Sequence, residues 1–123
     1  HPFDRWKQSD YYGMAAFFAP GSTTHPRTKK EVFAYALGTE MPEANPAGDR
    51  RVPLADWMTR PDNPFFARNL ANRVWAWMLG RGLIDPVDDV RATNPPSNPE
   101  LLDALAKYLV ENKYDVRKLV ALI

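Results

Sequence analysis

The chain has 123 residues, of which 45% are hydrophobic and 12% aromatic, so it is long enough for one domain with a buried core and hardly for two. Its 16 Lys and Arg nearly balance 15 Asp and Glu, which excludes the strongly basic surface typical of a nucleic-acid-binding protein. Without cysteine, it carries no disulfide, thiolate metal site or cysteine nucleophile. No apolar run reaches the roughly 18–20 residues that a membrane span requires.

A first helix is predicted from Ser9 or Asp10, either of which can accept a free backbone N–H group as the N-cap, to the break at Pro20 and Gly21. Gly13 lies inside this helix and weakens it by about 1 kcal/mol relative to alanine. We therefore expect another segment to approach the helix closely at this glycine.

Residues 20–48 are predicted to be an irregular connection. They include a loop around His25, a basic turn from Arg27 to Lys30, and an apolar run at residues 32–37. This run is either a short strand or one helical turn, because so short a segment has no decisive period.

Two helices are predicted in the middle of the chain. Residues 49–59 form the first, with Asp49 as its cap and a regular helix from near Arg51. The second begins at Asn63-Pro64, a capping side chain followed by proline, and ends at Gly80, which can adopt positive φ.

Two more helices are predicted near the C-terminus. Ser97 and Glu100 form a capping box before the first, which ends at Asn112, and Asp115 caps the last. The pattern thus predicts a mainly α fold, a small helical domain of about five helices with a long irregular or short-strand connection at residues 20–48. The last residues are apolar and uncapped, and we interpret the chain as a fragment of a longer protein.

One apolar row is expected to organise the C-terminal half. Phe66, Leu70, Val74 and Trp77 follow helical spacing and should face inward. They would hold the adjoining Asn72-Arg73 pair and the bend at residues 80–82 in place. Matching rows on the two later helices are Leu101, Leu105, Tyr108 and Leu109, and Val116, Leu119, Val120 and Ile123.

Polar residues in this half are candidates for a binding site. Asn72 and Arg73, followed by Trp75, could bind an anion or carboxylate, with the Arg73 guanidinium as a bidentate clamp. Alternatively, the two polar side chains satisfy buried loop carbonyls while Trp75 packs. Arg81, between two glycines, has the same two interpretations.

Three acids crowd the following loop. Asp85, Asp88 and Asp89 could hold calcium or activate a water nucleophile. They could equally cap the loop and pair with Arg81 or Arg91. The tryptophans Trp57, Trp75 and Trp77 are interpreted as core residues, with a sugar-stacking platform as the alternative.

The two histidines are each followed by proline and form no closely spaced pair, which argues against an autonomous zinc site. His25 is interpreted as an ordinary loop residue. His1 gains interest only from the resemblance described next.

Several ordered phrases of the sequence carry a family resemblance. They are HPFDRW at residues 1–6, DYYGMAAFF at 10–18, RR at 50–51, LADWMT at 54–59, NPFFAR at 63–68, NRVW at 72–75, GRGL at 80–83 and PPSNPELLD at 95–103. Together they resemble the large planctomycete cytochrome-c-associated proteins, which carry two adjacent domains of unknown function. The resemblance covers nearly the whole chain and implies that residues 1–20 end the first domain, residues 21–48 are a linker, and residues 49–123 begin the second, helical domain.

The resemblance also implies a cofactor and a compartment. In these proteins the His-Pro-Phe phrase follows a Cys-x-x-Cys-His motif for c-type haem attachment, so His1 would lie close to a haem or metal, with His1 itself as a candidate metal ligand. Trp6, Tyr11 and Tyr12 could line that pocket. Because it lacks the cysteines, this chain alone cannot attach haem covalently. The resemblance implies an extracytoplasmic location, periplasmic or at the cell surface, with the parent polypeptide or other extracytoplasmic proteins as partners.

Three hypotheses of function follow, and the sequence does not decide whether the chain is an enzyme. The first is a fragment of an extracytoplasmic haem-associated multidomain protein in redox chemistry or electron transfer. The second is a non-enzymatic helical binding or scaffold domain, with Asn72, Arg73, Arg81, Asp88 and Asp89 as ligand-binding candidates. The third is a component of a polysaccharide-processing enzyme with a pair of carboxylates drawn from the acidic loop.

Overall fold

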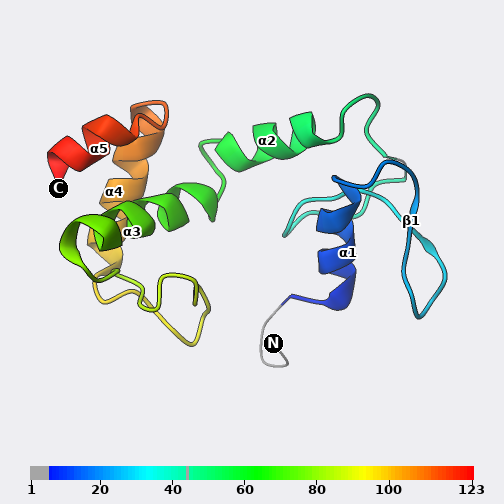
Figure 1. Cartoon of the computed structure of the whole chain (residues 1–123), viewed down its shortest axis with the longest axis horizontal. Helices are drawn as coiled ribbons and strands as arrows, with labels where there is room; N and C mark the ends of the chain where they lie inside the picture. Colours follow the sequence, from blue (N-terminus) through cyan, green and yellow to red (C-terminus); the bar gives the residue numbers. More distant parts are fainter. Residues whose placement is uncertain (1–5, 44) are drawn as a thin grey trace. The chain divides into compact units, whose positions relative to one another are not determined.

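A computed structural model of the chain describes residues 6–43 and 45–123. It divides into two compact units, residues 1–57 and 58–123, which are described separately. The expectation of a mainly helical fold with about five helices is confirmed (Figure 1). The elements found in the described ranges are α1 (Gln8–Ala16), β1 (Thr23–Thr24), β2 (Glu31–Val32), α2 (Arg51–Thr59), α3 (Phe66–Leu79), α4 (Pro99–Glu111) and α5 (Val116–Leu122).

The ends of α1 are held by the side chains of Asp10 and Arg50. Lys7, and not Ser9 or Asp10, is the N-cap residue, and Asp10 reaches back so that its Oδ2 accepts the Lys7 N–H at 2.7 Å. The prediction of the capping residue was therefore wrong by two or three positions, because Asp10 acts from the first turn. At the other end, Arg50 Nη1 donates to the carbonyl oxygens of Ala16 at 3.1 Å and Gly21 at 2.9 Å.

The apolar run at residues 32–37 contributes to a short antiparallel hairpin. Thr23 pairs with Val32 and Thr24 with Glu31, so only the first residue of the run is in a strand. Beyond it, the Tyr35 N–H donates to the Gly13 carbonyl at 3.3 Å. A Cβ on Gly13 would overlap the Tyr35 ring, which accounts for a glycine inside α1.

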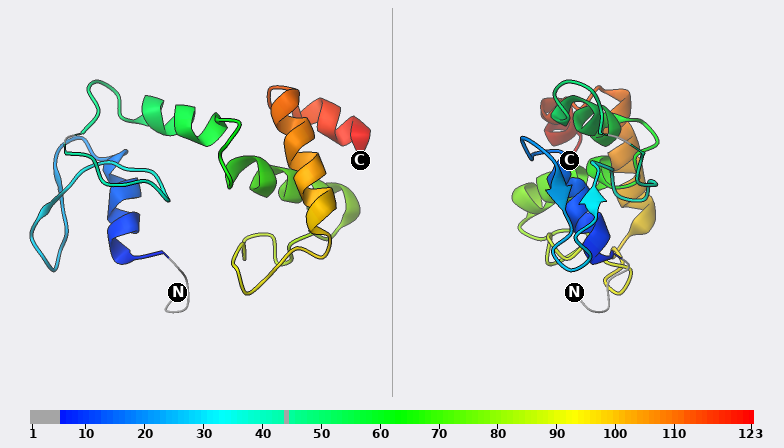
Figure 2. Two further views of the ribbon diagram at one scale, coloured as in Figure 1. Left: turned by 180° about the vertical axis from the view of Figure 1, so that it is seen from behind. Right: turned by 90° about the vertical axis from the view of Figure 1, so that its right-hand side faces the viewer.

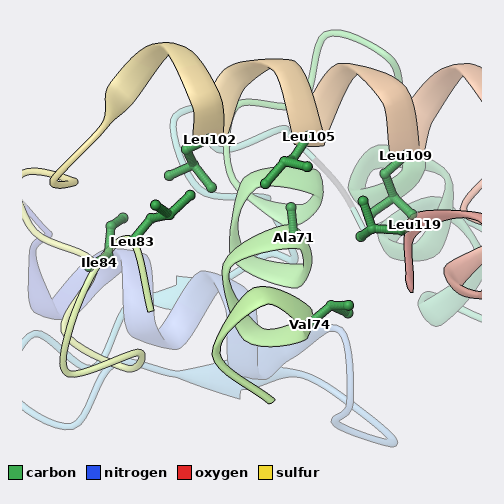
Figure 3. Close-up of a cluster of buried hydrophobic side chains, with 8 residues drawn as sticks. All are labelled: Ala71, Val74, Leu83, Ile84, Leu102, Leu105, Leu109 and Leu119. Carbon is green, nitrogen blue, oxygen red and sulfur yellow. The ribbon is translucent and has the colours of Figure 1, made fainter. Parts of the chain in front are cut away.

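The second unit packs α3, α4 and α5 so that each contacts the other two (Figure 2). Its core joins apolar residues of the three helices with two residues of the loop that links α3 to α4 (Figure 3). Because those two loop residues are buried, part of the loop backbone is also removed from water. The core residues are Ala71, Val74, Leu83, Ile84, Leu102, Leu105, Leu109 and Leu119.

The expected inward row on α3 is only partly correct. Val74 is buried, Leu70 packs against the core, and the Phe66 ring lies 5.5 Å from that of Tyr114. Trp77, however, is 72% exposed, so the prediction that it faces inward was wrong. Helical spacing predicts the direction of a side chain but not how far the neighbouring helix extends along that face. Val74 is the last buried residue of α3, and Trp77 lies beyond it.

The caps of the two C-terminal helices also differ in detail from expectation. Asn98, and not Ser97, caps α4 by accepting the Leu101 N–H at 3.0 Å. Asp115 caps α5 as expected, accepting the Arg117 N–H at 3.0 Å. Within the described residues, no helix is both long and apolar enough to cross a membrane.

Replacing Gly13 with alanine should destabilise the first unit. The new methyl group would overlap the buried Tyr35 ring, and overpacking of this kind costs about 1–3 kcal/mol, more than the roughly 1 kcal/mol that alanine gains in helix propensity. Gly21→Ala is the matched control, because a Cβ there meets nothing within 4 Å. Chemical denaturation of both variants measures the difference, and a Gly13→Ala variant as stable as Gly21→Ala would contradict the packing described.

Candidate functional site

The candidate site is the loop between α3 and α4, residues 80–98, together with the polar side chains of α3 that face it. Its centre is Asn72, which is 0% exposed. Asn72 Nδ2 donates to the Ile84 carbonyl at 2.9 Å, and Asn72 Oδ1 accepts the Ile84 N–H at 2.9 Å. One side-chain amide thus satisfies both backbone groups of a buried loop residue, which otherwise would be costly to remove from water.

Two glycines shape the start of the loop. Gly80 ends α3 with φ 78° and donates its N–H to the Ala76 carbonyl at 2.8 Å, the left-handed helix end that glycine favours. A Cβ on Gly82 would overlap the Ile84 carbonyl and lie 3.1 Å from Asn72 Nδ2. The close approach of the loop to Asn72 therefore depends on the absence of a side chain at residue 82.

The far end of the loop is tied to Leu83. The Leu83 carbonyl accepts the Ser97 N–H at 2.7 Å and the Ser97 hydroxyl at 3.1 Å. Between these ends, Asn94 Nδ2 donates to the carbonyls of Asp85 at 3.3 Å and Asp89 at 3.0 Å. The loop is consequently fixed by side-chain amides and a hydroxyl.

Arg73 lies next to this clamp and faces the acidic part of the loop. Its Nε donates to Asn69 Oδ1 at 3.1 Å, which orients the guanidinium, and its Nη2 pairs with Asp88 Oδ1. Asp88 is 77% exposed, so a pair of this kind contributes little to stability. The guanidinium is nevertheless already bound to a carboxylate of the same chain.

The other two acids of the loop also have arginine partners. Arg81 Nε lies 3.3 Å from Asp85 Oδ2, and Arg91 Nη2 donates to Asp89 Oδ2 at 2.8 Å. The hydrogen bond from Arg91 holds the pKa of Asp89 below its usual range. The acidic loop is therefore a set of Arg–Asp pairs, one of the alternatives that the sequence left open.

This arrangement has limited chemical capacity. Across residues 6–43 and 45–123, no group of three or more His, Cys, Asp or Glu side chains is placed to hold a metal ion. An acid whose pKa is lowered stays ionised, which is unsuitable for a general acid near neutral pH. An open hollow of about 310 Å³ adjoins the loop and is lined by Trp75, Leu79, Arg81, Gly82, Leu83 and Ser97.

The predicted cofactor-proximal residues lie in the other unit. His1 is outside the described residues. Trp6 is half-buried, Tyr11 is 68% exposed, and the ring of Tyr12 lies edge-on to those of Tyr11 at 5.2 Å and His25 at 5.1 Å. These aromatic rings could lie against a planar cofactor.

His25 is a poor ligand for an iron atom in this arrangement. Its Nδ1 accepts the N–H groups of Arg27 and Thr28, both at 3.2 Å, so a neutral ring carries its proton on Nε2 and its free lone pair is already used. Within the described residues, the aromatic cluster therefore contains no histidine whose ring nitrogen has a free lone pair. A histidine ligand from this chain would have to be His1.

Sequence reasoning missed the loop residues that do the fixing. Ser97 was assigned to a helix cap, and Asn94 and the backbone of Ile84 were not singled out. The available signal was Leu83-Ile84, two apolar residues in an otherwise polar and glycine-rich segment. Their burial requires partners for the backbone between them, and Asn72 is the nearest amide on the preceding helix.

A known protein family covers the part of the chain that contains this site. The family described as PSD1, Protein of unknown function (DUF1553), matches residues 50–123. The chain belongs to the DUF1553 family. The matched DUF1553 segment includes α2 to α5 and the whole loop around Asn72, whereas the hairpin precedes it. Neither a curated protein nor a solved structure matches the chain.

Asn72→Ala should destabilise the DUF1553 segment by about 2–4 kcal/mol, because it leaves a buried N–H and a buried carbonyl of Ile84 without partners. Asn69→Ala is the control on the same helix, since Asn69 Oδ1 accepts only a half-buried Arg73 Nε–H and its loss should cost less than about 1 kcal/mol. Urea denaturation followed by circular dichroism measures both. Equal stabilities of the two variants would show that Asn72 does not hold the loop.

The Asp89 carboxyl should titrate below the value of about 3.9 that is usual for aspartate. Since its pKa is lowered in the folded state, its contribution to stability is present above pH 4 and is lost as the pH falls through the folded pKa. Arg91→Gln should return the pKa of Asp89 toward about 3.9, whereas Arg81→Gln should leave it unchanged. Carboxyl ¹³C NMR titration measures these values, and an unchanged Asp89 pKa in Arg91→Gln would reject the pairing.

Proposed function

We propose that the chain is part of an extracytoplasmic haem-associated protein and that residues 58–123 are a non-enzymatic scaffold within it. The scaffold part of this proposal is supported by one observation, the pair of hydrogen bonds between the Asn72 side chain and the backbone of Ile84. Asn72 was one of the candidates for ligand binding, and both of its side-chain polar atoms are hydrogen-bonded to the backbone of Ile84.

The neighbouring charges support the same proposal. Arg73 and Arg81 each pair with an aspartate of the loop, so a ligand with a carboxylate would have to displace an acid that is already present. Such a surface suits a segment that keeps its shape while other parts of the protein bind or react. The side chains of Asn94 and Ser97 hydrogen-bond to the backbone of the loop itself.

The haem-associated half rests on the resemblance to planctomycete cytochrome-c-associated proteins. The family match over residues 50–123 agrees with one part of that resemblance, a domain of unknown function in this region. Tyr11 and Tyr12, which follow the N-terminal phrase closely in the sequence, would supply aromatic rings for such a cofactor. In the parent protein the haem would supply electron transfer, and this chain would supply position and a partly apolar environment.

A polysaccharide-processing role is less well supported by the geometry. Glycoside hydrolysis requires one carboxyl group that remains protonated to act as the acid and a second that remains ionised. The three loop acids each pair with an arginine, and the hydrogen bond from Arg91 lowers the pKa of Asp89, which makes Asp89 unsuitable as the acid.

The absorption spectrum of the full-length protein tests the haem half. A Soret band is expected, and His1→Ala should shift the spectrum or the reduction potential, while Arg73→Gln should leave both unchanged. A full-length protein without a Soret band and without bound metal would remove the haem association and leave the scaffold proposal intact.

A thermal melt combined with binding assays tests the scaffold half. Arg73→Gln and Arg81→Gln should leave every activity of the full-length protein unchanged, because neither guanidinium is needed for a ligand. If either variant melts at the parent temperature but loses a ligand or an activity, the scaffold proposal is wrong.

A further inference from the structure

The hairpin of the first unit has a cationic loop, residues 25–30, that the proposed function does not use. Arg27, Lys29 and Lys30 are all exposed. Within the described ranges none of the three forms an ion pair, which is also true of Lys113, Arg117 and Lys118, whereas six arginines each pair with an aspartate. Three unpaired cations thus lie within four positions of one loop.

The backbone of the cationic loop is fixed before any partner binds. His25 donates its N–H to the Lys30 carbonyl at 2.9 Å and accepts the Lys29 N–H on its own carbonyl at 2.8 Å. The His25 ring adds a third restraint by accepting two further N–H groups on Nδ1, and the Tyr12 ring of α1 packs edge-on against it. A loop ordered in advance loses less conformational entropy on binding.

The conformation of Lys29 adds a second observation. Its φ is 57°, a left-handed conformation that glycine and asparagine adopt far more easily than lysine. A lysine held in this conformation, in a loop with two other cations, concentrates charge at a position where backbone preference alone would favour glycine. Such local strain is found preferentially at functional positions.

We propose that the cationic loop docks an acidic stretch of a polypeptide partner. Three cations within four positions match a short run of carboxylates, and the Tyr12 and His25 rings give that run an aromatic neighbour. The loop has no large apolar side chain to insert into a lipid surface. Three cations on a chain of net charge +1 are also few for a nucleic-acid interface.

Fluorescence anisotropy with a labelled octapeptide of glutamate tests the proposal on the whole chain, with the glutamine octapeptide as the uncharged match. The glutamate peptide should bind, bind more weakly as salt is raised, and bind about tenfold more weakly to the triple variant Arg27→Gln, Lys29→Gln, Lys30→Gln. The control Lys107→Gln, Lys113→Gln, Arg117→Gln removes the same charge from the second unit and should change the affinity by less than about twofold.

Two further variants separate charge from loop shape. Lys29→Gly replaces the lysine with the residue best suited to positive φ and removes one cation, so it should weaken binding without lowering the melting temperature, even if the triple variant does not fold. His25→Ala keeps all three cations but removes the Nδ1 acceptor, and it should weaken binding by freeing the loop.

Four results would overturn the proposal. They are no binding of the glutamate peptide, equal binding of the glutamine peptide, equal weakening by the control triple variant, and stronger binding to phosphatidylglycerol-containing vesicles or to oligodeoxythymidylate than to the peptide. The last result would assign the loop to a lipid or nucleic-acid surface.

Discussion

The second unit depends on how a loop backbone is buried. The loop residues Leu83 and Ile84 have their side chains buried in the helical core. Burial of each side chain contributes about 1.5–3 kcal/mol to the free energy of unfolding. That burial also removes the N–H and carbonyl of Ile84 from water, and Asn72 replaces the lost hydrogen bonds with its own amide. The stabilisation from burying Leu83 and Ile84 is therefore obtained only when the Asn72 side chain lies opposite the backbone of Ile84.

The rest of the loop follows from this contact. Gly82 must lack a Cβ for the approach to occur, and Ser97 closes the other end on the Leu83 carbonyl. The Arg–Asp pairs add little to the stability of the loop conformation, because exposed ion pairs are individually weak. Since the buried hydrogen bonds matter more than the exposed ion pairs, a structural role is favoured for the polar residues of the DUF1553 segment. A binding surface is then more plausible elsewhere in the chain, as in the hairpin.

The sequence was sufficient to predict where the helices lie, but less so to predict which of their side chains are buried and what they contact. Proline, glycine and capping residues predicted the helices, and the Gly13 position correctly indicated a close contact, although not that Tyr35 makes it. Trp77 was misplaced because periodicity carries no information on how far a neighbouring helix extends. The two roles of Asn72 stayed open, because an amide that faces a ligand and one that faces a buried backbone have the same sequence pattern.

Amide hydrogen exchange at Ile84, followed by NMR, tests the central contact most directly. Its N–H lies in a loop without regular secondary structure, and its hydrogen-bond acceptor is Asn72 Oδ1 and not a backbone carbonyl of a helix or strand. We expect the Ile84 amide to exchange as slowly as the core amides of α3, through global unfolding. Exchange as fast as that of the exposed loop amides around Asp88 would contradict the account.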